Sequence, residues 1–170
     1  MVEADGVNWF LSHRFDPASR RLADRHYNRQ KVGTPQFVPP GRCLVLLTEA
    51  ADAFWVTSWP FAEFTMHRWA GAWVCSAFRN EGPMLSSLLI RDAVAATRAH
   101  FGEPPELGMI TFVDTSKVRR KKDPGYCYLM AGFERDGSTE GGLAALRLAP
   151  ERMPPAAPAR QRQGALWAAP

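Results

Sequence analysis

The sequence predicts a single α/β domain with a mixed central sheet flanked by helices. The chain has 170 residues, 46% of them apolar, which is enough to bury one proper core. In its middle a strand, a long helix and a second strand follow one another, and this order predicts a crossover between parallel strands. A candidate hairpin precedes this unit and predicts antiparallel pairing elsewhere in the sheet.

The first part of the chain predicts a strand, a helix and the hairpin. Residues 6–15 are apolar and partly alternating, which is typical of a strand. Residues 16–31 predict a helix, because Asp16 is a favourable N-cap and Pro17 fits the first helical position. After a loop rich in glycine and proline, residues 42–61 have the pattern of two strands around an acidic turn.

The central unit is predicted from its hydrophobic spacing. Residues 70–80 form its first strand, and a helix runs from Ser86 to about Phe101. One stripe of this helix is apolar, at Ile90, Ala93, Val94, Thr97 and Phe101. Gly102 has the position of a glycine that ends a helix. Residues 106–114 are almost continuously apolar, which favours a central buried strand.

The last part of the chain predicts a short helix, a strand and a tail. Residues 123–133 have the pattern of a short helix with Asp123 as its N-cap, and residues 141–150 that of a final strand. We therefore expect the domain at residues 1–150. Residues 151–170 are dominated by Pro, Ala, Gln and Arg, and we expect a weakly ordered tail there.

Charge and cysteine content limit the possible functions. The formal net charge is +4 and the isoelectric point about 9.3, which permits a polyanionic partner such as a nucleic acid. The three cysteines are far apart and form no Cys-x-x-Cys pair, which argues against a zinc knuckle or a disulfide framework. No apolar run approaches the length of a membrane-spanning helix. We expect a cytoplasmic protein with buried, reduced thiols.

The stretch "RNEGPM", residues 79–84, resembles the pyrophosphate-binding turn of the GNAT acyltransferase family. Arg79 and Gly82 fit the pattern of that turn. Pro83, which has no amide hydrogen, and Met84, in place of a small residue, depart from it. The resemblance implies a GNAT-like mixed sheet and acyl-CoA, such as acetyl-CoA, as the cofactor.

A second motif strengthens the resemblance to the GNAT family. In "YLMAGF", Tyr128 matches a tyrosine of the family's last helix that often serves as general acid. The resemblance covers roughly residues 40–148.

A closer resemblance is to the Mom-like proteins, phage-type proteins of GNAT fold that modify adenine in DNA. "RHYNR" contains a His-Tyr pair, "TFVD" ends in an aspartate after the long helix, and "RRKKDPGYCYLMAGF" joins a basic loop to the short helix. The resemblance implies a transfer to the N6 amine of a flipped adenine in the cytoplasm of a phage or bacterial host. The catalytic residues it implies are His26, Tyr27, Asp114 and Tyr128.

Elementary chemistry leaves alternatives open at His26 and Asp114. A histidine can take a proton from an amine or bind a metal, but a single helical histidine is often structural. Asp114 ends a strand, where sites of α/β sheets gather, and it can equally cap the turn that follows. If the two side chains converge, Asp114 either orients His26 or shares a metal with it, and iron is then the alternative cofactor.

The start of the long helix is a candidate anion site. A helix N-terminus presents amide donors, and an arginine beside it adds a forked cation. The candidate cofactor-binding residues are Arg79, Asn80, Gly82, Ser86 and Ser87. For the two serines, simple capping of the helix is the alternative.

Clusters of cations predict DNA as the partner. Five of the six residues in "KVRRKK", residues 117–122, are cationic, and the segment lies between Asp114 and the helix of Tyr128. Such a loop suits a phosphate backbone, although charge runs are often only solvated. The candidate DNA-binding residues are Arg25, Arg29, Lys31, Lys117, Arg119, Arg120, Lys121 and Lys122.

Three functions are therefore compared. The leading hypothesis is a Mom-like DNA-modifying enzyme that transfers a small acyl-type group to adenine. The first alternative is an acetyl-CoA-dependent N-acetyltransferase that acts on a small-molecule amine. The second alternative is a nucleic-acid-binding protein without catalytic activity.

Overall fold

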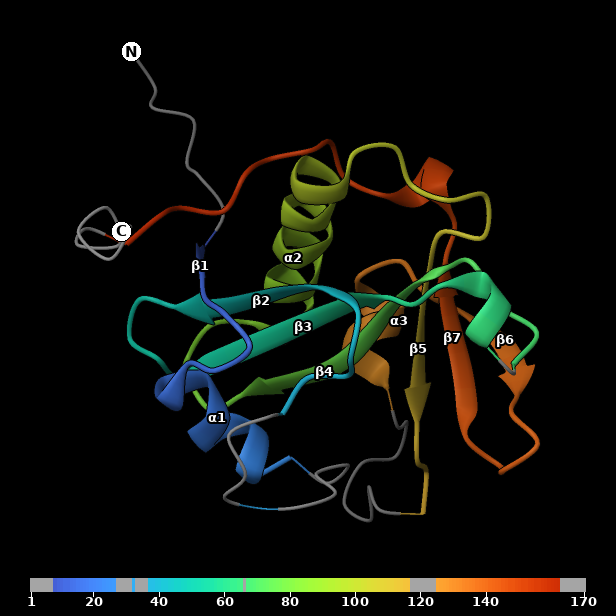
Figure 1. The fold of residues 1–170 in the computed structure, drawn as a ribbon, viewed down its shortest axis with the longest axis horizontal. Helices are drawn as coiled ribbons and strands as arrows, with labels where there is room; N and C mark the ends of the chain where they lie inside the picture. The colour runs from blue at the N-terminus through green and yellow to red at the C-terminus, as the bar shows by residue number, and fades with distance from the viewer. Residues whose placement is uncertain (1–7, 27–31, 33–36, 66, 117–124, 163–170) are drawn as a thin grey trace.

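The computed structural model describes residues 8–26, 32, 37–65, 67–116 and 125–162 (Figure 1). Within these residues the chain forms one α/β domain with a seven-strand, mixed, open sheet and three α-helices. The strands are β1 (Trp9–Leu11), β2 (Arg42–Thr48), β3 (Ala53–Trp59), β4 (Trp73–Asn80), β5 (Met109–Val113), β6 (Glu134–Ser138) and β7 (Ala144–Leu148). The helices are α1 (Pro17–Asp24), α2 (Ser86–Phe101) and α3 (Tyr126–Met130), with short 3₁₀ turns at η1 (Ala62–Phe64) and η2 (Pro150–Arg152).

The sheet has the strand order β1-β2-β3-β4-β5-β7-β6. Its β4–β5 pair is parallel, with α2 as the connection between the two strands, and the other pairs are antiparallel. The predicted hairpin of β2 and β3 and the predicted parallel pairing are both confirmed. The expected mixed α/β class is likewise confirmed.

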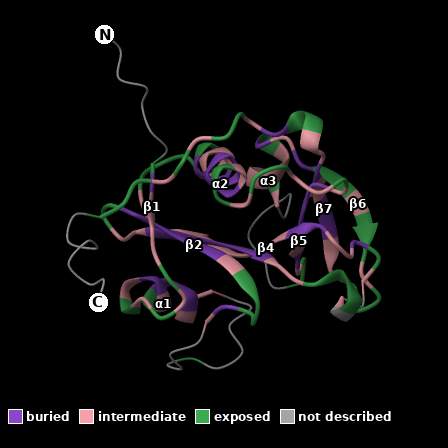
Figure 2. Cartoon of the chain, turned by 45° about the horizontal axis from the view of Figure 1, so that its top comes forward, coloured by how far each residue is buried: buried purple, intermediate pink, exposed green. Residues whose placement is uncertain are grey.

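Helices cover both faces of the sheet. In Figures 1 and 2, α2 and α3 lie on one face and α1 on the other. Alternate residues of a strand point to opposite faces, so Leu44 and Leu46 pack with the α2 side while Val45 and Leu47 pack with α1. Because both faces are buried, β2 and β3 are almost continuously apolar instead of alternating.

The long central helix is confirmed with the expected bounds. Its stripe of Ile90, Ala93, Val94 and Thr97 is buried against the sheet. Gly102 follows it with a φ of 89°, a left-handed value that glycine adopts at little cost. The interpretation of Ser86 and Ser87 as caps is wrong. Leu85 is the N-cap residue, and Ser86 is already the first residue of the helix.

The first helix is shorter than expected. Asp16 is its N-cap, as predicted, and its side chain accepts a hydrogen bond from the amide of Ala18. The helix ends at Asp24 instead of continuing past His26, so the expected helical placement of His26 is wrong. Its buried contacts end with Leu22 and Ala23, and the two described residues that follow the helix, Arg25 and His26, are polar and not buried.

Two differences concern the last part of the domain. Helix α3 begins at Tyr126 after Gly125, whose φ is 82°, so the expected start at residue 123 is wrong; Asp123 itself lies outside the described residues. Strand β6 was not expected. Its sequence "ERDGS" has no apolar residue, and it forms the exposed edge of the sheet beside β7.

Residues 151–162, part of the segment expected to be a tail, lie against the domain. Met153 is buried, the amide of Ala157 donates to the carbonyl of Ala95, and Arg160 forms a parallel bridge with Phe10 of β1. The segment therefore crosses α2 and reaches the outer edge of β1. In the part of the chain that the structure describes, no helix is long and apolar enough to span a bilayer.

Candidate functional site

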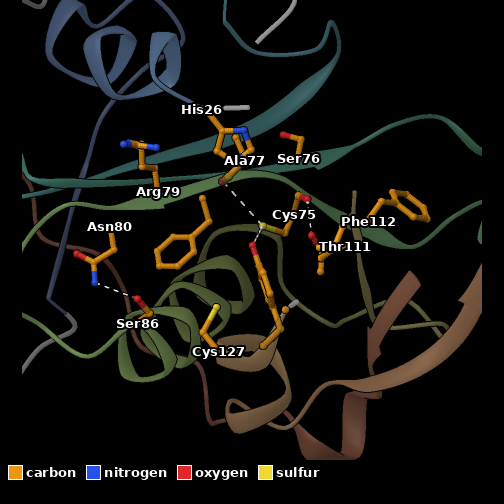
Figure 3. Close-up of a pocket in the computed structure, with 14 residues that line it drawn as sticks. His26, Cys75, Ser76, Ala77, Arg79, Asn80, Ser86, Thr111, Phe112 and Cys127 are labelled. Carbon is orange, nitrogen blue, oxygen red and sulfur yellow. Dashed lines mark hydrogen bonds between the residues drawn. The ribbon is translucent and has the colours of Figure 1, made fainter. Parts of the chain in front are cut away.

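A pocket opens where the two parallel strands separate. β4 and β5 pair only from Trp73↔Met109 to Cys75↔Thr111, although β4 continues to Asn80. The pocket between them has a volume of about 270 Å³. It is lined by His26, Cys75, Ser76, Ala77, Phe78, Arg79, Asn80, Ser86, Thr111, Phe112, Val113, Gly125, Cys127 and Tyr128 (Figure 3).

A β-bulge in β4 accompanies this separation. Val56 of β3 is opposite Ala77 and Thr57 is opposite Cys75, so Ser76 is an extra residue on β4. A bulge bends its strand and increases its twist. It lies where β4 leaves β5, and Ser76 itself lines the pocket. The bulge thus bends β4 at the point where the pocket opens.

Tyr128 of α3 forms one wall of the pocket. Its hydroxyl oxygen lies 3.6 Å from Cys75 Sγ, and its ring packs edge-on against Phe78 and Phe133. Its carbonyl accepts the amide of Phe133, which fixes the end of the short helix. Tyr126, two residues earlier, is instead 56% exposed. The two tyrosines therefore face different ways.

Cys75 is a buried thiol at the base of the pocket. Burial raises its pKa to about 12, against a smaller lowering by the hydrogen bond with Tyr128. The thiol is therefore protonated at neutral pH and acts as a weak hydrogen-bonding group instead of a nucleophile. The hydroxyl of Thr111 donates to the carbonyl of Cys75, which joins β5 to β4 at their last pair.

The turn after β4 uses its own amide donors. The amide of Glu81 donates to the carbonyl of Asp52, and the amide of Gly82 donates to the side-chain oxygen of Asn80. Pro83 has no amide hydrogen. Three successive positions therefore offer no amide to an anion, and the turn does not fit the pyrophosphate of acyl-CoA.

Glycine at position 82 has a reason within the protein. A Cβ atom there would lie 2.2 Å from Oδ2 of Asp52, in the turn between β2 and β3. Asp52 is held in place because its Oδ1 accepts the hydroxyl of Thr48 at 2.7 Å. The close approach of two turns accounts for Gly82 without a bound phosphate.

Arg79 and Arg25 share one carboxylate. Arg25 donates twice to Glu81, at 2.7 and 2.8 Å, and Arg79 donates to Glu81 and to the carbonyl of Arg25. The hydrogen bonds from Arg25, and to a smaller extent that from Arg79, lower the pKa of Glu81 to about 2. The contact with Glu81 in turn raises the pKa of Arg25. The group is on the surface, so its net stabilisation is small. Both arginines hold the segment after α1 against the end of β4.

His26 lines the pocket, whereas Asp114 is not among its lining residues. His26 follows α1 and lines the mouth of the pocket, across from Cys127 (Figure 3). Asp114 follows β5 but is not among the lining residues, and it accepts hydrogen bonds from the amide and hydroxyl of Ser116. Within the described residues, no three His, Cys, Asp or Glu side chains gather into a possible metal site.

Of the other candidate site residues, the structure describes some and leaves the rest outside the described part of the chain. Asn80 and Ser86 line the pocket, whereas Ser87 belongs to α2 but does not line it. The remaining candidates lie outside the described residues, namely Tyr27, Arg29, Lys31, Lys117, Arg119, Arg120, Lys121 and Lys122.

Some lining residues were not expected from sequence. Cys75, Phe78 and Thr111 have the apolar or β-branched character of any buried strand, so their residue types carry no functional signal. What indicates a functional site is their position beside the end of the parallel strand pair, and that position can be found only when the strand register is known.

The fold and the pocket define an α/β domain with a polar pocket at the carboxyl end of its parallel strand pair. Neither a protein-family model, nor a curated protein, nor a solved structure matches this chain.

Proposed function

We propose that the protein is a Mom-like transferase of GNAT-like fold that attaches a small acyl-type group to the N6 amine of adenine in DNA. The observation that carries the proposal is the pocket between β4 and β5. It is lined by both His26 and Tyr128, two of the catalytic residues that the resemblance to the Mom-like proteins implies. These residues come from segments far apart in the chain. Their meeting at one polar pocket is what a shared reaction centre requires.

The size of the pocket supports a small reacting group. Its volume of about 270 Å³ lies just below the roughly 300–1,000 Å³ usual for drug-sized ligands. It suits an unstacked base or the reactive end of a donor. An entire nucleotide cofactor would extend beyond it.

The chain around the pocket supports an anionic polymer as the substrate. The cationic segment 117–122 directly follows Ser116, and two residues separate it from Gly125, which lines the pocket. The net charge of +4 and this run of cations in the sequence favour phosphate contacts, which give affinity without choice of sequence. Adenine must leave the duplex to reach the pocket.

The chemical roles follow from residue type and position. His26 accepts a proton from the N6 amine as the new bond to nitrogen forms. Tyr128 donates a proton to the group that leaves the donor, while its hydroxyl is positioned beside the protonated Cys75 thiol. Asp114, on the turn after β5, does not line the pocket. It accepts hydrogen bonds from Ser116, so it acts indirectly, by positioning the turn after β5.

Nucleoside mass spectrometry tests the proposal. The wild type, Tyr128→Phe and His26→Ala are expressed in a bacterial host, and the host DNA is digested and searched for a new adenosine mass. We expect a modified adenosine with the wild type and a loss of roughly 10²–10⁴-fold in its rate of formation with Tyr128→Phe, the contribution usual for general acid catalysis.

Matched controls separate chemistry from folding. Tyr126→Phe removes a hydroxyl from the same helix but from an exposed side chain, and His100→Ala removes an exposed histidine at the far end of α2. Both should leave the modification unchanged. Unmodified DNA from a folded wild type, or equal losses in Tyr126→Phe and Tyr128→Phe, would contradict the proposal.

A second candidate is non-catalytic nucleic-acid binding, and the turn with its internally bonded amides favours it over acetyl-CoA-dependent acetylation of a small amine. This candidate predicts salt-sensitive DNA binding that persists in His26→Ala, Asp114→Ala while the host DNA stays unmodified. The small-amine acetyltransferase instead predicts an increase in melting temperature with acetyl-CoA and no affinity for DNA.

A further inference from the structure

A leucine occupies the exposed start of α2, directly before Ser86, which lines the pocket. Leu85 is the N-cap residue, and it makes no capping hydrogen bond with its side chain. Ser, Thr, Asp and Asn are the residues that stabilise this position, and leucine is among the least favourable. The side chain is also 63% exposed, so it adds little to the core. Neither helix capping nor packing accounts for leucine here.

The backbone of Leu85 is nevertheless held firmly. The side-chain amide of Asn80 donates to the carbonyl of Met84 at 2.7 Å and to the hydroxyl of Ser86 at 3.0 Å. The carbonyl of Leu85 itself accepts the amide of Leu89. One amide group therefore fixes the residues on both sides of Leu85, while the side chain of Leu85 extends into solvent.

The same amide belongs to the pocket wall. Asn80 and Ser86 both line the pocket, and Figure 3 shows their side chains joined at one side of it. Leu85 thus has a fixed position relative to the space that would receive a base. An exposed apolar side chain on a fixed backbone, next in sequence to a residue of a polar pocket, suits a partner whose apolar interior opens at that pocket.

We propose that Leu85 enters the base stack of duplex DNA and fills the place of the adenine that moves into the pocket. This inference rests on the proposed function, because it requires a base as substrate. Extruding a base breaks stacking on both sides, and apolar side chains inserted between base steps are a known means of compensating for it. The leucine is buried between bases only in that state, so its hydrophobic gain favours extrusion.

Fluorescence of 2-aminopurine tests the inference without requiring the donor. A duplex is built on a sequence that is modified in the host DNA, with 2-aminopurine in place of the target adenine. Its emission rises when the base leaves the stack, and anisotropy of an end-labelled duplex measures binding separately. We expect Leu85→Ala to reduce the equilibrium constant of extrusion about tenfold, equivalent to about 1.4 kcal/mol, with little change in binding.

Three comparisons make the result specific. Leu88→Ala removes the same side chain, also exposed at 56%, one turn further along α2, and should keep the emission increase. Leu85→Met retains apolar bulk and should also keep it. With a mismatch opposite the target, extrusion costs less, and Leu85→Ala should regain most of the emission.

Each result decides the inference. Full emission with Leu85→Ala, or equal losses with Leu88→Ala, would overturn it while the proposed DNA modification stands. A wild type that binds the duplex without a rise in emission would also overturn the inference. A folded wild type that modifies no host DNA would overturn the function and the inference together.

Discussion

Substitution of Gly82 by alanine tests the packing of the turn that borders the pocket. The new Cβ atom would approach Oδ2, Cγ and Oδ1 of Asp52 to between 2.2 and 2.9 Å. Asp52 must then move, and its hydrogen bond with Thr48 is lost. The backbone of Gly82 does not have a left-handed φ, so the approach to Asp52 is the main obstacle to a side chain.

The size of the effect follows from two opposing contributions. A hydrogen bond to a charged group contributes about 1.5–3 kcal/mol to the free energy of unfolding. Alanine in place of glycine recovers about 0.4–1 kcal/mol by restricting the unfolded chain. We expect a net loss of about 1–2 kcal/mol. For a chain of this size, that loss lowers the melting temperature by roughly 2–8 °C.

A double-mutant cycle with Asp52→Ala gives the decisive measurement. Unfolding in urea is measured for both single variants, the double variant and the wild type. Without the Asp52 carboxylate, Gly82→Ala should be neutral or stabilising by up to about 1 kcal/mol. Additive losses would refute the reasoning, because they would mean that Gly82 is required for something other than the space beside Asp52.

Three further predictions concern stability and reactivity. Because the pKa of Glu81 is depressed, its ion pairs stabilise the fold above pH 4.5 and are lost as pH falls towards 2. Glu81→Gln should therefore reduce the fall in the free energy of unfolding over that pH range by less than about 1 kcal/mol, measured by denaturation at each pH. Cys75, with a pKa of about 12, should resist iodoacetamide at pH 8 until the protein unfolds, as peptide mass spectrometry would detect. Thr97→Val removes the buried hydroxyl contact with Thr57 and should lower the free energy of unfolding by about 1–2 kcal/mol, measured by urea denaturation.

The sequence predicts the centre of the domain better than its margins. The stripe of α2 and the apolar run of β5 are long, regular and buried, and their patterns follow from the face they bury. Strand β6 carries no such pattern, because an edge strand with both faces exposed needs no apolar residue. Its pairing with β7 is decided by backbone hydrogen bonds that no periodicity reports.

The candidate site is predictable in its residue types but not in its geometry. His26, Asn80 and Tyr128 were singled out from short motifs, and they line one pocket. The pocket itself depends on the bulge at Ser76 and on where β4 leaves β5, and both are properties of strand register. For Arg79 the sequence suggests a phosphate ligand, and it does not reveal that the side chain contacts Glu81 instead.

The bridge between Phe10 and Arg160 has a consequence for folding during synthesis. The outer edge of β1 exposes backbone groups until residue 160 covers it. At usual ribosomal rates of about 5–20 residues per second, that edge is open for roughly 7–30 s after β1 has been made. Throughout that interval the nascent chain presents an unpaired strand edge, and it is then that pairing with a neighbouring chain competes with completion of the native sheet.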